Sequence, residues 1–124
     1  MLVAGTLMDE YQVEVGKIME SELIGLGLMT QKDIDNQNPE WPAYKKYFPH
    51  GNSHFLGLDV HDVGNRYRRF EAGNVLTCEP GIYIREEGLG IRLENNILIT
   101  EDGNINLMAH FPIEIDEIES LMNP

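Results

Sequence analysis

The sequence predicts an α+β fold, in which a long N-terminal helix precedes an antiparallel sheet and a short helix ends the chain. Apolar residues near the N-terminus recur at three- and four-residue steps, the pattern of one face of an amphipathic helix. After residue 50 the chain contains aliphatic segments separated by glycines, which is typical of antiparallel strands. The length of 124 residues is enough for about one domain.

The first helix is predicted over residues 7–26. Thr6 stands before acidic residues at positions 9 and 10, a pattern typical of a capped helix N-terminus. Gly25 and Gly27 then supply the stop. The apolar stripe of this helix, which we expect to pack in the core, consists of Leu7, Tyr11, Val15, Ile18, Met19, Leu23 and Leu26.

Turn-forming residues divide the rest of the chain. Residues 31–49 are polar and rich in asparagine and proline, and they predict a loop with a short helix around Asp33. The later predicted elements are, in order, strands over residues 53–60, 75–79 and 91–100, a turn over 101–104 and an acidic helix over 113–122.

Charge and cysteine content exclude several kinds of partner. Lys and Arg number 9 against 21 Asp and Glu, which gives a formal net charge of −12. This excess repels phosphate backbones and anionic bilayers, so we expect neither nucleic acid nor a membrane as partner. The one cysteine, Cys78, permits no internal disulfide and fits a reducing compartment. Since no leader pattern and no apolar run of about 20 residues is visible, a cytoplasmic location is expected.

Three of the four histidines, His50, His54 and His61, fall within twelve residues. A helical ligand pair is disfavoured here because the segment contains a proline and two glycines. On a strand, His54 and His61 would lie on opposite faces, so they need a bend between them to converge. Taken alone, the cluster is more typical of surface polar residues than of a ligand set.

Two further segments place carboxylates at the ends of apolar strands. Glu79 ends a predicted strand before a Pro-Gly break, and a buried carboxylate is costly unless it is paired, protonated or bound to a metal. Alternation places Cys78 on the opposite face, where it is expected to be a core thiol. Arg92 and Glu94 share one face of the last strand, which taken alone favours an ion pair on its solvent side.

Taken together, these segments indicate a function more specifically than any one of them does alone. The histidines, Glu-Pro-Gly at residues 79–81 and Gly-Ile-Arg-Leu-Glu at residues 90–94 closely resemble, in this order and spacing, the pita-bread metallopeptidases. Ser53-His54 and Leu-Asp-Val-His-Asp-Val-Gly at residues 58–64 look like the aminopeptidase P group of that family. The resemblance covers nearly the whole chain.

The resemblance implies a partial pita-bread fold, with a curved antiparallel sheet, a long N-terminal helix and a short C-terminal helix. Residues 1–124 would be the C-terminal part of the catalytic domain. The implied activity is metal-dependent hydrolysis of the Xaa-Pro bond at peptide N-termini, and the implied partners are peptides with proline in the second position. Two alternatives stay open: a prolidase acting on Xaa-Pro dipeptides, and a non-catalytic module that binds peptides or partners.

Carried over to this sequence, the resemblance makes His54, Glu79 and Glu94 metal ligands. Glu94 would bridge two divalent ions, and Glu79 would also be the general base that activates a water. A neutral imidazole and carboxylate oxygens suit Mn²⁺, the ion expected first, as well as Zn²⁺, Co²⁺ or Fe²⁺.

Three more residues receive substrate roles from the resemblance. His61 would bind the scissile carbonyl and stabilise the developing oxyanion, which makes it catalytic. His50 would line the pocket near the substrate proline, and Arg92 would orient the substrate or neighbouring carboxylates. Because an Xaa-Pro bond has no amide hydrogen, such an enzyme relies on polarising the carbonyl and on a proline-shaped pocket.

Part of the family's site cannot be placed in this sequence. The family uses two aspartates on strands upstream of the long helix, and Asp9, Asp33 and Asp35 fall in helix or loop positions. Asn95-Asn96 stands where the family usually has an acidic pair. We therefore expect an N-terminally truncated chain that holds part of the dinuclear site, binds metal weakly and is inactive by itself. Uncovered strand edges and apolar surface also predict a homo-oligomer, formed by edge pairing or by exchange of the N-terminal helix.

Overall fold

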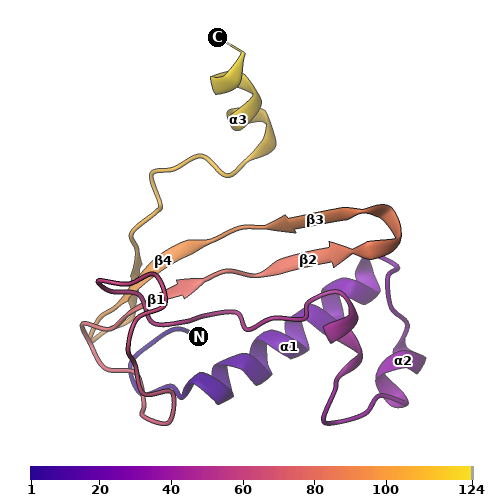
Figure 1. Ribbon diagram of the computed structural model, residues 1–124, viewed down its shortest axis with the longest axis horizontal. Coiled ribbons are helices and arrows are strands. Elements are labelled where there is room, and N and C mark those ends of the chain that lie inside the picture. The colour runs from indigo at the N-terminus through magenta and orange to yellow at the C-terminus, as the bar shows by residue number, and fades with distance from the viewer. Residues whose placement is uncertain (124) are drawn as a thin grey trace.

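The computed structural model describes residues 1–123, and it confirms the predicted α+β class. A long helix lies beneath an antiparallel ribbon, and a short C-terminal helix stands away from both (Figure 1). The helices are α1 (Met8–Gly25), α2 (Gln31–Asp35) and α3 (Ile115–Met122), with 3₁₀ turns at Ala43–Lys46 and Arg85–Glu87. The strands are β1 (Val75–Cys78), β2 (Gly81–Ile84), β3 (Leu89–Arg92), β4 (Asn95–Ile99) and β5 (Asn104–Asn106).

Helix α1 matches the predicted helix except at its start and in part of its stripe. The predicted Thr6 cap is wrong: Leu7 is the capping position, and its N–H donates to the Glu10 carboxylate at 3.2 Å. Ile18 and Leu26 are exposed, so the buried stripe is narrower than predicted. The helix ends before Gly27, whose φ of +72° is a conformation that glycine adopts at low cost. The short helix predicted around Asp33 is confirmed as α2.

The sheet is an antiparallel ribbon that is interrupted in the middle. β1 pairs with β4, whose other edge pairs with β5, while β2 pairs with β3. Across the interruption the Leu93 N–H still donates to the Pro80 carbonyl, at 3.3 Å. The single strand predicted over 91–100 is therefore wrong, because the chain leaves regular pairing at Leu93 and Glu94 and resumes it in β4. The turn predicted at 101–104 closes the β4–β5 hairpin, and its last residue already belongs to β5.

The strand predicted over residues 53–60 is also wrong. Residues 52–56 do run antiparallel beside β1, through three backbone hydrogen bonds of 3.0–3.1 Å. The chain then reverses, because the Gly57 N–H donates to the Asp59 carbonyl at 3.2 Å and the Asp62 N–H donates to the Phe55 carbonyl at 3.1 Å. Local turn contacts thus replace sheet pairing after Leu56.

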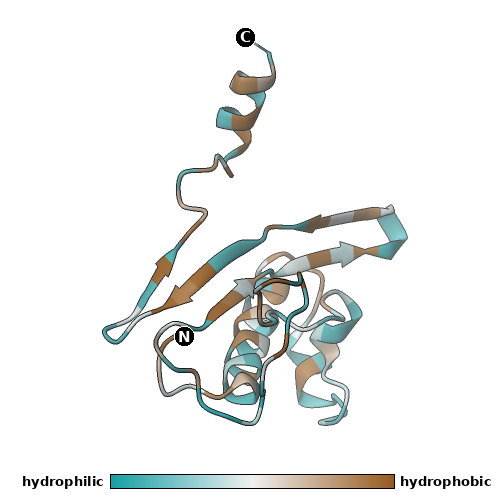
Figure 2. Cartoon of the chain, turned by 60° about the vertical axis from the view of Figure 1, so that its left-hand side comes forward, coloured by the Kyte–Doolittle hydropathy of each residue, from teal (hydrophilic) through white to brown (hydrophobic). Residues whose placement is uncertain are grey.

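The core lies between α1 and the β1–β4 part of the sheet. Figure 2 shows hydrophobic residues along β1 and β4, with polar residues near the turns. The most deeply buried apolar side chains are Phe48, Phe70, Leu23, Leu76 and Ile99. Helix α3 contributes nothing to this core, since all of its residues are exposed. None of the helices in the described part of the chain has the length and apolarity needed to cross a bilayer.

Candidate metal centre

The interruption of the ribbon holds the two carboxylates predicted as ligands. β1 and β2 are separated by Glu79 and Pro80, and β3 and β4 are separated by Leu93 and Glu94. The Glu79 N–H turns away from the ribbon partner and donates to the Asn52 carbonyl at 3.0 Å. The two glutamates therefore face each other where neither belongs to a strand, and Glu79 is buried whereas Glu94 is exposed.

His54 completes a group of three metal-ligand donors. One ligand atom each from His54, Glu79 and Glu94 lies within 4.8 Å of the others, which confirms the predicted convergence of the three residues. The His54 Nε2 is 3.3 Å from the Glu79 Oε1. Its Nδ1 is 2.9 Å from the Phe55 carbonyl oxygen. A carbonyl oxygen accepts and never donates, so we assign the proton to Nδ1, which leaves the Nε2 lone pair free for a metal.

Arg92 supplies the positive charge closest to this group. Its Nη1 lies 3.5 Å from the Glu79 Oε2, on the oxygen that does not face His54. Two carboxylates about 4 Å apart repel by about 4 kcal/mol at an effective dielectric of 20. Arg92, which reaches the buried Glu79, offsets part of this repulsion, and a bound cation would also offset it.

The bend predicted between His54 and His61 is present. The two imidazole rings stack, with centroids 3.9 Å apart and planes inclined by 20°. The Asp62 carboxylate holds the turn, because it accepts hydrogen bonds from the Val63 N–H at 2.6 Å and the Asp59 N–H at 3.3 Å. These backbone donors lower the pKa of Asp62 below its ordinary value of 3.8.

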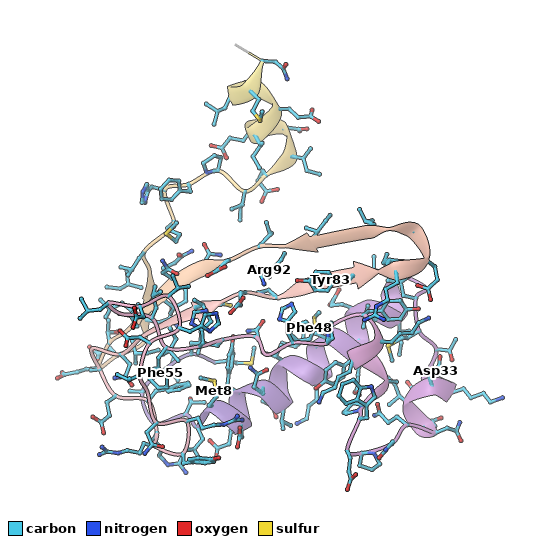
Figure 3. All side chains as sticks on the ribbon, in the orientation of Figure 1. Met8, Asp33, Phe48, Phe55, Tyr83 and Arg92 are labelled. Atoms are coloured by element: carbon cyan, nitrogen blue, oxygen red, sulfur yellow. The ribbon has the colours of Figure 1, made fainter. Side chains whose placement is uncertain are left out.

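His50 is held by a tyrosine that the sequence analysis did not single out. Its Nε2 lies 3.0 Å from the Tyr83 hydroxyl, and its Nδ1 lies 2.7 Å from the Gly51 carbonyl oxygen. The Tyr83 ring lies over glycines on both strands of the β2–β3 hairpin, since a Cβ at Gly81 or Gly90 would come within 2.9 Å of it. Register places Gly81 opposite Arg92, so Tyr83 and Arg92 share one face (Figure 3).

All six predicted site residues line one cavity of about 320 Å³. They are His50, His54, His61, Glu79, Arg92 and Glu94. The six residues therefore lie close together, and the role of each one stays a prediction. The sequence analysis did not identify Tyr83 and Thr77 as neighbours of the site. Both occupy odd-numbered positions, like Glu79, and alternation along β1 and β2 places such positions on the same face.

The predicted core thiol is confirmed on the opposite face. Cys78 packs against the core, with its sulfur 3.6 Å from the Tyr11 hydroxyl. The Asn52 amide also donates to this hydroxyl, and burial raises the pKa of Tyr11. At Glu79 the ribbon therefore separates a polar cavity on one face from the core on the other.

Comparisons with known proteins identify the family to which this chain is similar. The family model "Metallopeptidase family M24" matches residues 1–101. The chain is 43% identical to the Xaa-Pro aminopeptidase of Haemophilus influenzae, covering 99% of this chain and 31% of that protein. It is 46% identical to the Xaa-Pro aminopeptidase of Escherichia coli, covering 95% of this chain and 29% of that protein.

Solved structures show the same fold. The Zn-substituted E. coli aminopeptidase P in complex with product superposes with a TM-score of 0.82 at 44% identity, over 98% of this chain and 30% of that one. Proline aminopeptidase P II from Yersinia pestis gives 0.83 at 42% identity, over 99% and 31%. The partial pita-bread fold implied by the sequence is thereby confirmed. The chain spans less than a third of the length of these relatives, and it belongs to metallopeptidase family M24.

Proposed function

We propose that this chain supplies part of a metal centre that hydrolyses the Xaa-Pro bond at peptide N-termini. The observation that carries the proposal is the convergence of His54, Glu79 and Glu94, with ligand atoms within 4.8 Å. The named relatives, which are Xaa-Pro aminopeptidases, support the choice of reaction. Peptides with proline in the second position are therefore the proposed substrates.

The donor set fits a divalent ion. One imidazole and two carboxylates suit Mn²⁺, which we propose first, and also Zn²⁺, Co²⁺ or Fe²⁺. Three protein ligands leave positions open for water and substrate. A bound ion would lower the pKa of a water molecule and polarise a carbonyl. Residues 1–123 offer one such group of three donors, so we propose one ion per chain, while a second ion would need further ligands.

We propose separate roles toward the substrate for Glu79 and for the other residues of the cavity. Glu79, buried beside His54 and Arg92, would take the proton of the attacking water. His61 stacks on His54 and would donate a hydrogen bond to the oxyanion. His50, fixed by the Tyr83 hydroxyl, would bind near the substrate proline. The relatives favour aminopeptidase over prolidase specificity.

Calorimetry with Mn²⁺ or Zn²⁺ tests the proposed centre. We expect one ion per chain with a dissociation constant on the order of micromolar or weaker, because the ligand set is incomplete. His54→Ala should abolish the binding heat, whereas His110→Ala, a change of an exposed histidine outside the cavity, should leave it unchanged. Tight binding of two ions, or Xaa-Pro hydrolysis on the order of 1 per second, would contradict the proposed partial site. Absence of any binding would favour the non-catalytic module.

Self-association and a cytoplasmic location stay predictions. Helix α1 is packed in its own core, so exchange of this helix is disfavoured and edge pairing is the better-supported route. Among the described strands, β5 pairs on one side with β4 and its three residues are exposed. We expect light scattering at micromolar concentration to give a dimer or a larger assembly. A monomer of 14.1 kDa would contradict this expectation.

A further inference from the structure

Thr77 lies in β1, two residues before Glu79, and is fully buried. Its backbone N–H donates to the His54 carbonyl at 3.0 Å, and its carbonyl accepts from the Ser53 hydroxyl at 2.5 Å. Its side-chain Oγ1 accepts from the His54 N–H at 3.0 Å and lies 3.1 Å from the Glu79 Oε1. Every polar group of this threonine therefore contacts the segment that carries His54 or the carboxylate of Glu79.

The direction of these hydrogen bonds follows from their chemistry. The His54 backbone N–H can only donate, so the Thr77 oxygen accepts from it. The one hydroxyl proton of Thr77 is then free for the Glu79 carboxylate, which accepts when ionised. The hydroxyl thus joins the backbone of one ligand to the carboxylate of another, across two segments that are 23 residues apart in sequence.

The same hydroxyl also restricts how Glu79 can turn. Thr77 and His54 lie on the Oε1 side of the carboxylate, and Arg92 lies on the Oε2 side. A side chain held on both oxygens loses the freedom to rotate away from Glu94. In a metal site, the groups that hydrogen-bond to the ligands orient them, and removing such a group usually costs 10–100-fold in metal affinity.

We propose that Thr77 is a positioning residue for the metal centre, which fixes the Glu79 carboxylate and the His54 backbone in their ligand arrangement. The inference rests on the proposed function, since it assigns to Thr77 an effect on metal binding. A residue that only completed the packing of β1 would affect folding stability and leave metal affinity of the folded protein unchanged. Metal affinity and stability therefore separate the two roles.

The test compares Thr77→Val, which keeps the shape and removes the hydroxyl, with Thr77→Ser, which keeps the hydroxyl and removes a methyl group. Co²⁺ is titrated into each metal-free chain and followed by calorimetry and visible absorption, and circular dichroism records the folded fraction. We expect Thr77→Val to weaken Co²⁺ binding about tenfold or more and Thr77→Ser to restore it to within about threefold. Thr100→Val, the same chemical change at a half-buried threonine outside the cavity, is the matched control and should bind Co²⁺ like the wild type.

The outcomes distinguish this inference from the function on which it rests. Equal Co²⁺ affinity of wild type and Thr77→Val would overturn the positioning role and leave the metal centre standing. A wild-type chain that binds no Co²⁺ would overturn the metal centre and the role of Thr77 with it. Should Thr77→Val not fold, Thr77→Ala is compared with Thr77→Ser, because only the serine retains the hydroxyl: binding about tenfold weaker in Thr77→Ala supports the role, and equal affinities of the two variants would overturn it.

Discussion

Replacement of Glu79 by alanine is expected to abolish measurable Mn²⁺ or Zn²⁺ binding by this chain. Glu79 is the buried carboxylate of the donor group, with its Oε1 3.3 Å from the His54 Nε2 and a ligand atom within 4.8 Å of one of Glu94. Without it, one imidazole and one exposed carboxylate remain, and two ligands rarely hold a divalent ion against water. Calorimetry measures the loss directly.

Two controls make the result specific. Glu87→Ala removes the same charge from an exposed residue of the β2–β3 turn and should leave the binding heat intact. Glu79→Gln keeps the size of the side chain and an oxygen that can accept from Thr77, but it removes the negative charge. We expect Glu79→Gln to weaken binding strongly while the protein stays folded. Retention of wild-type affinity in Glu79→Ala would show that the ion is bound elsewhere.

The sequence predicted the residues of the site more accurately than the bounds of the strands that carry them. Motif order identified six residues around one cavity, and those residues do line it together. The break in the ribbon at Glu79 and at Leu93-Glu94 was only half visible in the sequence. Pro80 lacks an N–H and signals the first break. The second break, at Leu93-Glu94, contains no proline or glycine and lies across the ribbon from Pro80, so the local sequence does not signal it.

The strand predicted in the histidine segment was wrong for a different reason. Aliphatic residues separated by glycines favoured a strand over 53–60, and the first half of the segment does pair with β1. Gly57 and the carboxylate of Asp62 then fold the chain back, since Asp62 accepts from two backbone N–H groups of the turn. Such side-chain to backbone bonds compete with sheet pairing, and short sequence windows do not show which of them wins. The stacking of His54 on His61 is a consequence of that competition.

Leu76→Ala is expected to destabilise the protein by about 2–5 kcal/mol, the range for truncating a fully buried leucine. Leu76 is 0% exposed, pairs with Ile97 of β4 and forms a bridge with Phe55 on its other side. The cavity left by the truncation would therefore lie in the core between α1 and the sheet, against which Phe55 of the segment that carries His54 also packs. A loss of this size is a large fraction of the 5–15 kcal/mol that typically stabilises a domain.

Urea unfolding followed by circular dichroism measures this effect, with Leu58→Ala as the matched control. Leu58 is 104% exposed in the turn beyond Gly57, so the same chemical change should shift stability by less than about 0.5 kcal/mol. Because Phe55 packs against this core, the neighbouring His54 is held less firmly in Leu76→Ala, and metal affinity should fall even where the variant is still folded. Equal stabilities of the two alanine variants would contradict the prediction that burial of Leu76 in the core stabilises the fold.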